Sequence, residues 1–566
     1  MIQNMKTRLS LAFVALSVAA GAQTLQDAIT KTNNENFALA GTDFAALIAK
    51  ESSKGENYFY YGENFFANDD IDGANGQYQK GAEVNATYPL NYVGLGKVLL
   101  FKGKEADAKA MFYKAATLGA NKNAEVMRKT AEAYLLAENK NPDEAINQLN
   151  NAIKIDAKNP ENYILMGDAL LEKNPTDGSA PIKNYQKASE LNPKSTKGIL
   201  REGKLYQRGR NYQLAIDYYK KALEIDATFA PAYRELAEVY MMAARNKEAI
   251  EYWKKYLELN NSNDARYRYF TALFKNKQYQ DAINEGEGLL KNKYSNLYIQ
   301  RLLGYAYYEL GNKTDTAAYT KGSKNINEFF QLAGTDFKYL ATDYKYKGQL
   351  LSKTGKDSLG TVEIEKAINL DPTANCELWS EVARIWSKAK NYNKSIAAWE
   401  KRTACSKALS GQDYFEFGRS YYSAAGAKQR EAATIKDAKA KQSKEAEAIP
   451  YFIKADTCFS ALVRSNPSFP AGYYWKGRVE TYLDPLNEKW LSKPLFEKAL
   501  ELTKPNEKTS SYKSNVIEAL EYLGYYHLTQ NNNKANPESD KYFNELKTID
   551  AANEKAKNYF APPKGK

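Results

Sequence analysis

Residues 233–240 read Tyr-Arg-Glu-Leu-Ala-Glu-Val-Tyr, and this stretch decides the fold of the chain. Together with the segment that follows it, the stretch places small and aromatic residues at helical spacing on two consecutive helices. These positions are Tyr233, Leu236, Ala237, Tyr240, Ala249 and Trp253. Gly203 holds the place of Ala237 in the preceding segment, 34 residues earlier. The sequence therefore predicts a repeated helix pair with a 34-residue period.

Small residues recur along the first half, at the point where the two helices of a pair approach closely. Any side chain larger than a methyl group would push the helices apart there. In first helices these positions are Gly62, Gly96, Ala131, Gly167, Gly203 and Ala237. In second helices they are Ala74, Ala108, Ala145, Ala215, Ala249 and Ala282, with Pro181 in the missing place. Proline is tolerated there only in the first turn of a helix.

The pattern continues after residue 280 with looser spacing. The next small positions of first helices are Gly304, Gly348, Ala383, Gly418, Gly477 and Gly524. Their wider spacing indicates insertions, of which the largest lies around residues 427–447 (Lys428 to Glu447). This Lys- and Glu-rich run has alanines at helical spacing, which predicts two lengthened, solvated helices rather than a binding arm. We expect about 12 or 13 repeats in all.

This pattern resembles the tetratricopeptide repeat (TPR) family over roughly residues 25–550, and the chain looks like an exported bacterial member. The resemblance implies an all-α fold, an α-α superhelix or solenoid, in which first helices line a concave groove and second helices form the convex back. Each helix pair buries its apolar face only by stacking on its neighbours. We expect a signal peptide at residues 1–22, an N-terminal TPR array at 23–323 and a more irregular TPR array at 324–566.

The first 22 residues have the three parts of a secretory signal peptide. Lys6 and Arg8 form a short basic region, Leu9–Ala20 is apolar, and Ala20-Gly21-Ala22 is a small-residue cleavage site. The apolar run is too short to span a bilayer, for which about 20 residues are needed. No cysteine follows the cleavage site to carry a lipid anchor. We expect an exported, periplasmic protein whose mature chain begins near Gln23.

Composition excludes two other classes of protein. The net charge of +12 is spread over 566 residues, whereas nucleic-acid binding needs basic residues clustered on one face. The mean hydropathy is −0.65, and no second apolar run predicts a transmembrane helix. Tyrosine is abundant at 44 residues, but most tyrosines fall in repeat positions and are expected in the core.

Three cysteines occur, Cys376, Cys405 and Cys458. Cys376 opens the first helix of one pair and Cys405 closes its second helix, so antiparallel packing brings both to the same end. A disulfide needs Cα atoms within about 7 Å and an oxidising compartment. Cys458 lies about one repeat further on, which is too far. We expect at most one disulfide, Cys376 to Cys405.

Catalytic chemistry is not visible in the sequence. His527 is the single histidine and lies in a tyrosine-rich repeat helix, where a packing role is expected. No Cys or His cluster has metal-ligand spacing, and there is no phosphate-binding glycine loop or serine elbow. The acidic residues 69–72 lack the alternating ligands and distal glutamate of a calcium loop. We expect no enzymatic activity, no metal and no cofactor.

The residue after each small position of a first helix is expected to face the groove. These residues are Glu63, Lys97, Glu132, Asp168, Lys204, Glu238, Tyr305, Gln349, Arg384, Arg419 and Arg478. Groove positions beside them in the second half are Tyr298, Arg301, Tyr308, Phe415, Tyr422 and Tyr474. Arginine beside tyrosine is typical of protein-binding hot spots, although solvent-facing positions also collect charge, and both interpretations remain open.

The three arginines carry the sharpest hypothesis. Arg384, Arg419 and Arg478 would form a row suited to an extended acidic peptide. Replacing them by alanine is expected to weaken partner binding and to change thermal stability little.

The leading functional hypothesis is a non-enzymatic, exported scaffold that binds protein or peptide partners in its groove, within an envelope or secretion assembly. The alternative is a glycan-binding protein that uses aromatic platforms, as SusD-type proteins do. Those proteins are usually lipid-anchored, with irregular inserts. A third hypothesis, a hydrolase in the charged insertion, fails because the insertion has no catalytic residues.

Overall fold

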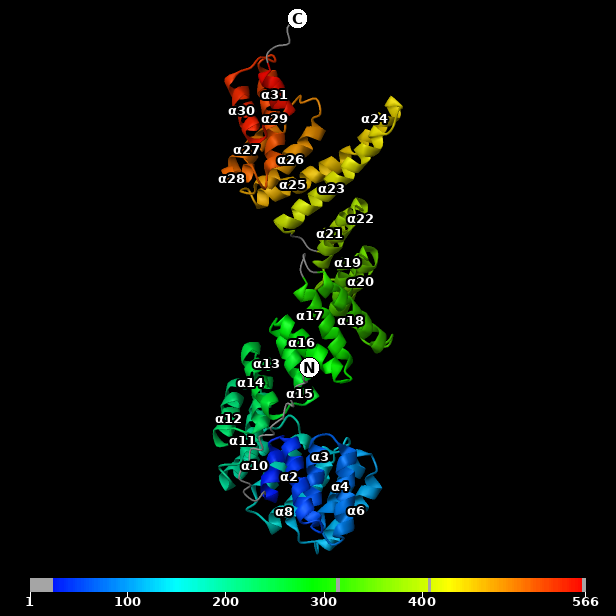
Figure 1. Cartoon of the computed structure of the whole chain (residues 1–566), viewed down its shortest axis with the longest axis vertical. Coiled ribbons are helices and arrows are strands. Elements are labelled where there is room, and N and C mark those ends of the chain that lie inside the picture. Colours follow the sequence, from blue (N-terminus) through cyan, green and yellow to red (C-terminus); the bar gives the residue numbers. More distant parts are fainter. Residues whose placement is uncertain (1–23, 312–315, 406–408, 562–566) are drawn as a thin grey trace, which may run out of the picture. The chain divides into compact units, whose positions relative to one another are not determined.

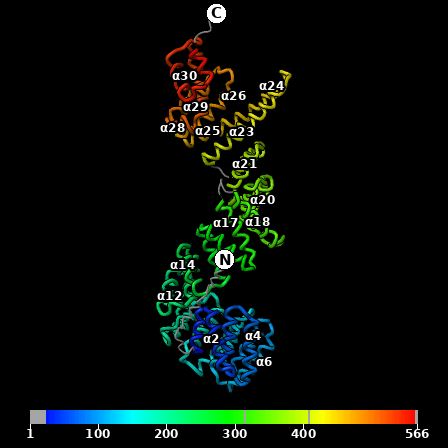
Figure 2. The backbone as a smooth tube through the Cα atoms, in the orientation of Figure 1, coloured from blue at the N-terminus to red at the C-terminus, as the bar shows by residue number. Residues whose placement is uncertain are grey.

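The structure, a computed structural model, describes residues 24–311, 316–405 and 409–561. Every regular element within these residues is an α-helix, and consecutive helices pack as antiparallel pairs (Figures 1 and 2). The predicted all-α solenoid of helix pairs is therefore confirmed. The predicted signal peptide at residues 1–22 lies outside the described residues. No helix within them has the length and apolar character needed to cross a membrane.

Contacts divide the chain into two units, which we call unit 1 (Met1–Ile299) and unit 2 (Gln300–Lys566). The division falls inside helix α17 (Leu297–Leu310). The boundary expected at residue 323 lies within α18 (Ala317–Ala333).

Unit 1, coloured blue to green in Figure 1, contains eight helix pairs before α17. Its helices are α1 (Leu25–Asn33), α2 (Phe37–Lys50), α3 (Gly55–Ala67), α4 (Ile71–Val84), α5 (Leu90–Phe101), α6 (Glu105–Leu118), α7 (Ala124–Leu136), α8 (Pro142–Ile155), α9 (Pro160–Lys173), α10 (Ser179–Leu191), α11 (Thr196–Arg208), α12 (Tyr212–Ile225), α13 (Ala230–Met242), α14 (Asn246–Leu259), α15 (Asn263–Lys275) and α16 (Tyr279–Lys291).

Unit 2 continues the pairing with insertions. Beyond α17 and α18, its helices are α19 (Ala341–Lys353), α20 (Asp357–Leu370), α21 (Leu378–Lys388), α22 (Tyr392–Cys405), α23 (Gly411–Ala433), α24 (Ala438–Ala446), α25 (Ile449–Ser465), α26 (Pro470–Leu483), α27 (Lys493–Leu502), α28 (Pro505–Lys508), α29 (Lys513–Gln530), α30 (Pro537–Ile549) and α31 (Glu554–Phe560).

Glycines in the first helices pack against aromatic rings of the second helices. A Cβ atom added to Gly203 would lie 2.6 Å from the Tyr219 ring, and one added to Gly477 would lie 2.7 Å from the Phe496 ring. Real Cβ atoms do not approach other heavy atoms so closely. The small-residue series predicted from the sequence therefore marks the contact between paired helices. Pro181 lies in the first turn of α10, where its missing N–H costs nothing.

First helices also contact one another along unit 1. The contacts run α3–α5, α5–α7, α7–α9, α9–α11 and α11–α13, so these helices form the inner, concave layer of the array. Alanines of the second helices, such as Ala215 and Ala249, are fully buried between the layers. The inner layer is thus the surface that any groove ligand would meet.

The charged insertion forms helices, as predicted. It comprises the end of α23, which is 23 residues long, and the short helix α24. Lys428 lies 2.7 Å from Glu447, and Lys444 lies 3.1 Å from Glu431, while α24 has no buried residue. The insertion is therefore a solvated helical extension held by ion pairs.

Unit 2 contains a disulfide between Cys376 and Cys405, whose Cα atoms lie 6.0 Å apart. Cys376 lies just before α21, and Cys405 ends α22, so both are at one end of this helix pair. The Arg402 Nη1 donates to the Cys376 sulfur at 3.5 Å. Cys458 is buried in α25 and carries no disulfide.

Candidate functional site

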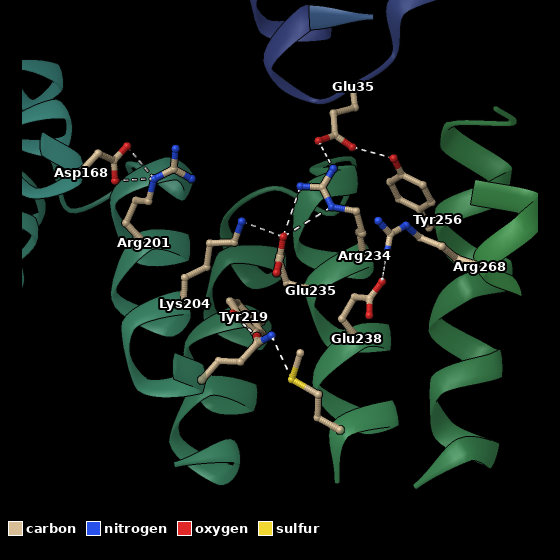
Figure 3. Close-up of polar contacts among 12 residues, drawn as sticks. Glu35, Asp168, Arg201, Lys204, Tyr219, Arg234, Glu235, Glu238, Tyr256 and Arg268 are labelled. Carbon is tan, nitrogen blue, oxygen red and sulfur yellow. Dashed lines mark hydrogen bonds and ion pairs between the residues drawn. The ribbon is translucent and has the colours of Figure 1, made fainter. Parts of the chain in front are cut away.

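Charged residues on the inner layer of unit 1 pair with residues of neighbouring repeats (Figure 3). Arg201 Nε donates to both oxygens of Asp168 at 2.9 Å. Lys204 lies 2.9 Å from Glu235, and Arg268 lies 2.7 Å from Glu238. The positions predicted to face the groove therefore do share one layer. Much of their charge is neutralised within the chain.

Glu63 lies at the centre of the most enclosed of these networks. Its carboxylate binds Lys97, and it accepts from Lys129 at 3.1 Å and from the Tyr78 hydroxyl at 2.6 Å. Lys129 in turn lies 2.7 Å from Glu132. Burial alone would raise the pKa of Glu63, but Lys97 and Lys129 outweigh burial and hold this pKa well below its ordinary value. This part of the concave layer is filled by the chain's own side chains.

The turn between α1 and α2 also reaches the inner layer. Arg234 Nη1 of α13 donates to one oxygen of Glu35, and the Tyr256 hydroxyl of α14 donates to the other at 2.7 Å (Figure 3). Asn34 Nδ2 donates to Asp226 at 2.8 Å and to Thr228 at 3.0 Å. Residues about 200 positions apart are thus joined by polar contacts within unit 1.

Beside this paired surface, unit 1 has an open cavity of about 690 Å³. Helices α9 and α11 contribute most of its lining. Its cations are Lys140, Arg201, Lys204, Arg208 and Arg210, and its carboxylates are Asp168 and Glu172. Leu171, Leu205 and Met242 supply an apolar part of the wall.

Two cations of this cavity are not engaged by acidic groups. Arg208 and Arg210 are exposed, and within the described residues no carboxylate lies at ion-pair distance from either. Lys140, by contrast, lies 2.9 Å from Glu172. The cavity therefore combines excess positive charge with apolar surface, which suits a ligand that carries carboxylates on an apolar frame.

In unit 2, two of the three predicted arginines are engaged with carboxylates of the following first helix. Arg384 Nη2 donates to Asp413 at 2.9 Å, and Arg384 Nε donates to Glu416. Arg478 Nε donates to both oxygens of Glu518, at 3.0 and 2.8 Å. Arg384 and Arg478 are therefore engaged within the chain, and partner binding by the three predicted arginines stays a prediction.

Arg419 is different because its guanidinium lies over aromatic rings. The group lies 5.7 Å from the Phe415 ring and 5.2 Å from the Trp475 ring. Arg478 lies over the same Trp475 ring at 4.7 Å. Arg419 is exposed, and no described carboxylate is within ion-pair distance of it. The structure therefore brings Arg419 and Arg478 together through Trp475.

The other predicted groove residues of unit 2 divide between two clusters. Arg301 Nε and the Tyr305 hydroxyl both donate to the buried Asp343. Tyr308 packs edge to face on Tyr346, with ring centroids 5.4 Å apart.

Tyr422 packs edge to face on Trp475 at 5.3 Å. Tyr474 is 1% exposed and shares a hydrogen bond of 3.0 Å with Thr503, so the prediction that it lines the groove is wrong. Tyr298, which belongs to unit 1, is 39% exposed.

His527 packs among aromatic residues. Its ring stacks on Tyr542 with a centroid distance of 5.4 Å and meets Tyr526 edge to face. Burial lowers its pKa below the ordinary value. In the part of the chain that the structure describes, no three His, Cys, Asp or Glu side chains gather as metal ligands would.

Comparison with known families assigns the repeat. Residues 205–273, which run from α11 to α15, match the family model described as tetratricopeptide repeat. Residues 205–273 are therefore assigned as tetratricopeptide repeats. The matched residues include Arg208 and Arg210 of the cavity and Arg234 and Tyr256, which contact Glu35, so part of each site lies on the recognised repeats. The fold is that of a protein-interaction scaffold.

Solved structures similar to this chain include the C-terminal part of a TPR repeat-containing protein from Cytophaga hutchinsonii. It is 27% identical, covers 52% of this chain and 99% of its own, and has a TM-score of 0.41. A TPR protein from Parabacteroides merdae is 18% identical, covers 45% of this chain and 98% of its own, and has a TM-score of 0.31.

A third, YrrB, described as a TPR protein with an unusual peptide-binding site, is 21% identical, covers 33% of this chain and 95% of its own, and has a TM-score of 0.21. No curated protein matches the chain.

The sequence interpretation named Lys204 but missed Arg208 and Arg210, the two exposed arginines of the cavity. Arg201, Lys204 and Arg208 recur at three- and four-residue spacing and so share one face of α11. That signal was present in the sequence. The Glu35 contact had no such signal, because nothing in the local pattern relates the α1–α2 turn to α13.

Proposed function

We propose that the protein is a non-enzymatic scaffold whose unit 1 binds an acidic, partly apolar segment of a protein partner on its concave side. The observation that carries this proposal is the cavity of about 690 Å³, in which five cations face two carboxylates. Arg208 and Arg210 supply charge that the chain itself leaves available. This proposal moves the binding surface from the arginine row of unit 2 to the α9–α13 region.

The chemistry of the cavity favours a peptide over a compact anion. Arginine forks bind carboxylates through two parallel hydrogen bonds, and Leu171, Leu205 and Met242 offer apolar contact between the charges. A segment with glutamates or aspartates around a leucine-like side chain satisfies both parts of the wall. Hot spots in protein interfaces combine arginine with apolar surface in this way.

The site of action belongs to the same proposal. The basic, apolar and small-residue parts of the first 22 residues support export, which would place the scaffold in the periplasm and make envelope proteins its partners. The disulfide of unit 2 is compatible with an oxidising compartment. The glycan alternative finds less support, since the Trp475 ring carries the Arg419 and Arg478 guanidiniums.

The proposal is tested by calorimetric titration of the full mature chain. The probe is a synthetic octapeptide with four glutamates around two leucines, and the same peptide with glutamines is the reference. We expect the double variant Arg208→Glu, Arg210→Glu to bind the acidic probe at least tenfold more weakly than the wild type, and binding to weaken with salt.

A matched control is available on α12, where Lys220 and Lys221 are both exposed. Lys220→Glu, Lys221→Glu makes the same change of net charge away from the cavity. Equal losses in the two double variants would mean that net charge alone attracts the probe. Equal affinity of the wild type for the acidic and glutamine peptides would overturn the proposal.

A further inference from the structure

Polar groups join the α1–α2 turn to the inner layer. Arg234 and the Tyr256 hydroxyl hold the two oxygens of Glu35, and Asn260 Nδ2 donates to the Tyr256 hydroxyl at 2.9 Å. Asn34 contributes the two hydrogen bonds to Asp226 and Thr228. Glu35 has a backbone φ of 57°, in the left-handed region that residues other than glycine adopt at some cost.

These groups amount to a binding subsite for one carboxylate. Arg234 is also held by Glu235 at 3.2 Å, so its guanidinium stays in place without Glu35. A carboxylate from a ligand would replace Glu35 with the same charge and the same hydrogen bonds.

The subsite is continuous with the surface of the proposed function. Lys204 lines the cavity of about 690 Å³ and lies 2.9 Å from Glu235, the same carboxylate that Arg234 contacts (Figure 3). A second cavity of about 540 Å³, lined by Glu35, Arg234, Tyr256 and Arg268, opens beside the turn. A peptide that runs from the first cavity toward α13 therefore meets Glu35.

We propose that Arg234 and Tyr256 form a carboxylate subsite that Glu35 occupies in the free protein, and that an acidic partner segment binds there by displacing the α1–α2 turn. This inference rests on the proposed function and adds a competitor built into the chain. Helices α1 and α2 are held to α3 by a small apolar cluster that includes Phe44 and Leu47, so the turn between them lifts from α13 while the helix pair stays folded. The affinity for the partner then depends on the difference in binding free energy between the partner's carboxylate and the Glu35 carboxylate at the same subsite.

Titration of the full chain with the acidic octapeptide tests this competition. Glu35→Gln keeps the shape of the side chain and removes its charge, and we expect it to bind the probe about tenfold more tightly than the wild type. Asn34→Ala loosens the turn and leaves Glu35, Arg234 and Tyr256 unchanged, so it should also bind more tightly. Adding Arg234→Ala to Glu35→Gln should abolish the gain.

Hydrogen exchange supplies an independent readout. On binding of the probe, the amides of residues 34–36 in the wild type should exchange faster, which a merely structural turn would not show. Affinities of Glu35→Gln and Asn34→Ala equal to or below that of the wild type would overturn the competition. In that case a selective loss in the Arg208, Arg210 variant would still support the proposed function, whereas no binding by any variant would overturn both.

Discussion

Arg478 of α26 and Glu518 of α29 form a two-oxygen ion pair between neighbouring first helices, with Nε donating at 3.0 and 2.8 Å. Arg384 makes the corresponding contacts with α23. The arginines that the sequence places at equivalent positions therefore make different contacts. Two join repeats, and Arg419 lies exposed over aromatic rings.

Single alanine variants of these arginines should separate the two roles. Arg478→Ala leaves Glu518 half-buried without its partner, so we expect unit 2 to lose about 1–2 kcal/mol of stability. Arg384 is 45% exposed, and its loss should cost about 1 kcal/mol or less. Arg419→Ala should stay within about 0.5 kcal/mol of the wild type. Urea unfolding curves measure all three.

This expectation replaces the one that the sequence alone suggested, in which replacing all three arginines by alanine changes thermal stability little. A loss in Arg419→Ala as large as that in Arg478→Ala would show that stacking on Trp475 outweighs the ion pair.

Two glycine-to-alanine variants should change the free energy of unfolding in opposite directions. In Gly203→Ala the new Cβ meets the Tyr219 ring at 2.6 Å, so the helices must separate, at a cost of about 1–3 kcal/mol. Gly76 lies inside α4 with nothing within 4 Å of an added Cβ. Gly76→Ala should therefore stabilise the helix by about 0.5–1 kcal/mol. Thermal unfolding of the two variants, beside the wild type, checks the pair, and destabilisation by both would contradict the assigned packing.

The cysteines should differ in reactivity. Burial raises the pKa of the Cys458 thiol to about 12 from its ordinary 9.0, so the reactive thiolate is nearly absent at pH 8. Iodoacetamide at that pH should leave the folded protein unmodified and should label Cys458 once urea unfolds it. Peptide mapping without reductant should find Cys376 joined to Cys405. Rapid labelling of Cys458 in the folded protein would contradict its burial.

Glu63 should make unit 1 sensitive to acid. Its folded-state pKa lies below the ordinary 4.5, because Lys97 and Lys129 outweigh burial. Stability from this group is therefore present above pH 4.5 and is lost as the pH falls through the lowered pKa. Glu63→Gln should cost about 3 kcal/mol at pH 7, since it leaves the buried Lys97 without its carboxylate partner. Its unfolding free energy should also change less than that of the wild type between pH 4.5 and pH 3.

Export predicts a processed N-terminus. Mass spectrometry of the protein purified from its native envelope fraction should show a chain that begins near Gln23. An intact Met1 in that fraction would contradict export through a cleaved signal peptide.

The repeat architecture could be predicted from the sequence because its determinant is local and periodic. Gly203 must be small since Tyr219 lies against it, and these two residues are close in the chain. The same holds for Gly477 and Phe496. Each such contact is repeated with the period of the array, so many weak signals agree.

The candidate site was less predictable because its contacts join different repeats. The groove position of Arg478 followed from the spacing, but its partner Glu518 lies 40 residues away, across an irregular segment. The Glu35 contact spans 199 residues and depends on the curvature of unit 1. Sequence spacing assigns a residue to a face, while its charge partner is decided by how successive repeats stack.

The charge pairs of unit 1 also restrict how this array could grow by copying repeats. Lys97 and Lys129 match Glu63, Arg201 matches Asp168, and Arg268 matches Glu238 only at their present separations. A duplicated repeat inserted at any of these junctions would leave a carboxylate on one side and a cation on the other without their ion-pair partners. The ion pair of Glu35 with Arg234 acts over a longer span, because one added repeat between α2 and α13 would carry Arg234 out of reach. The contact between Glu35 and Arg234 therefore fixes the number of repeats between α2 and α13.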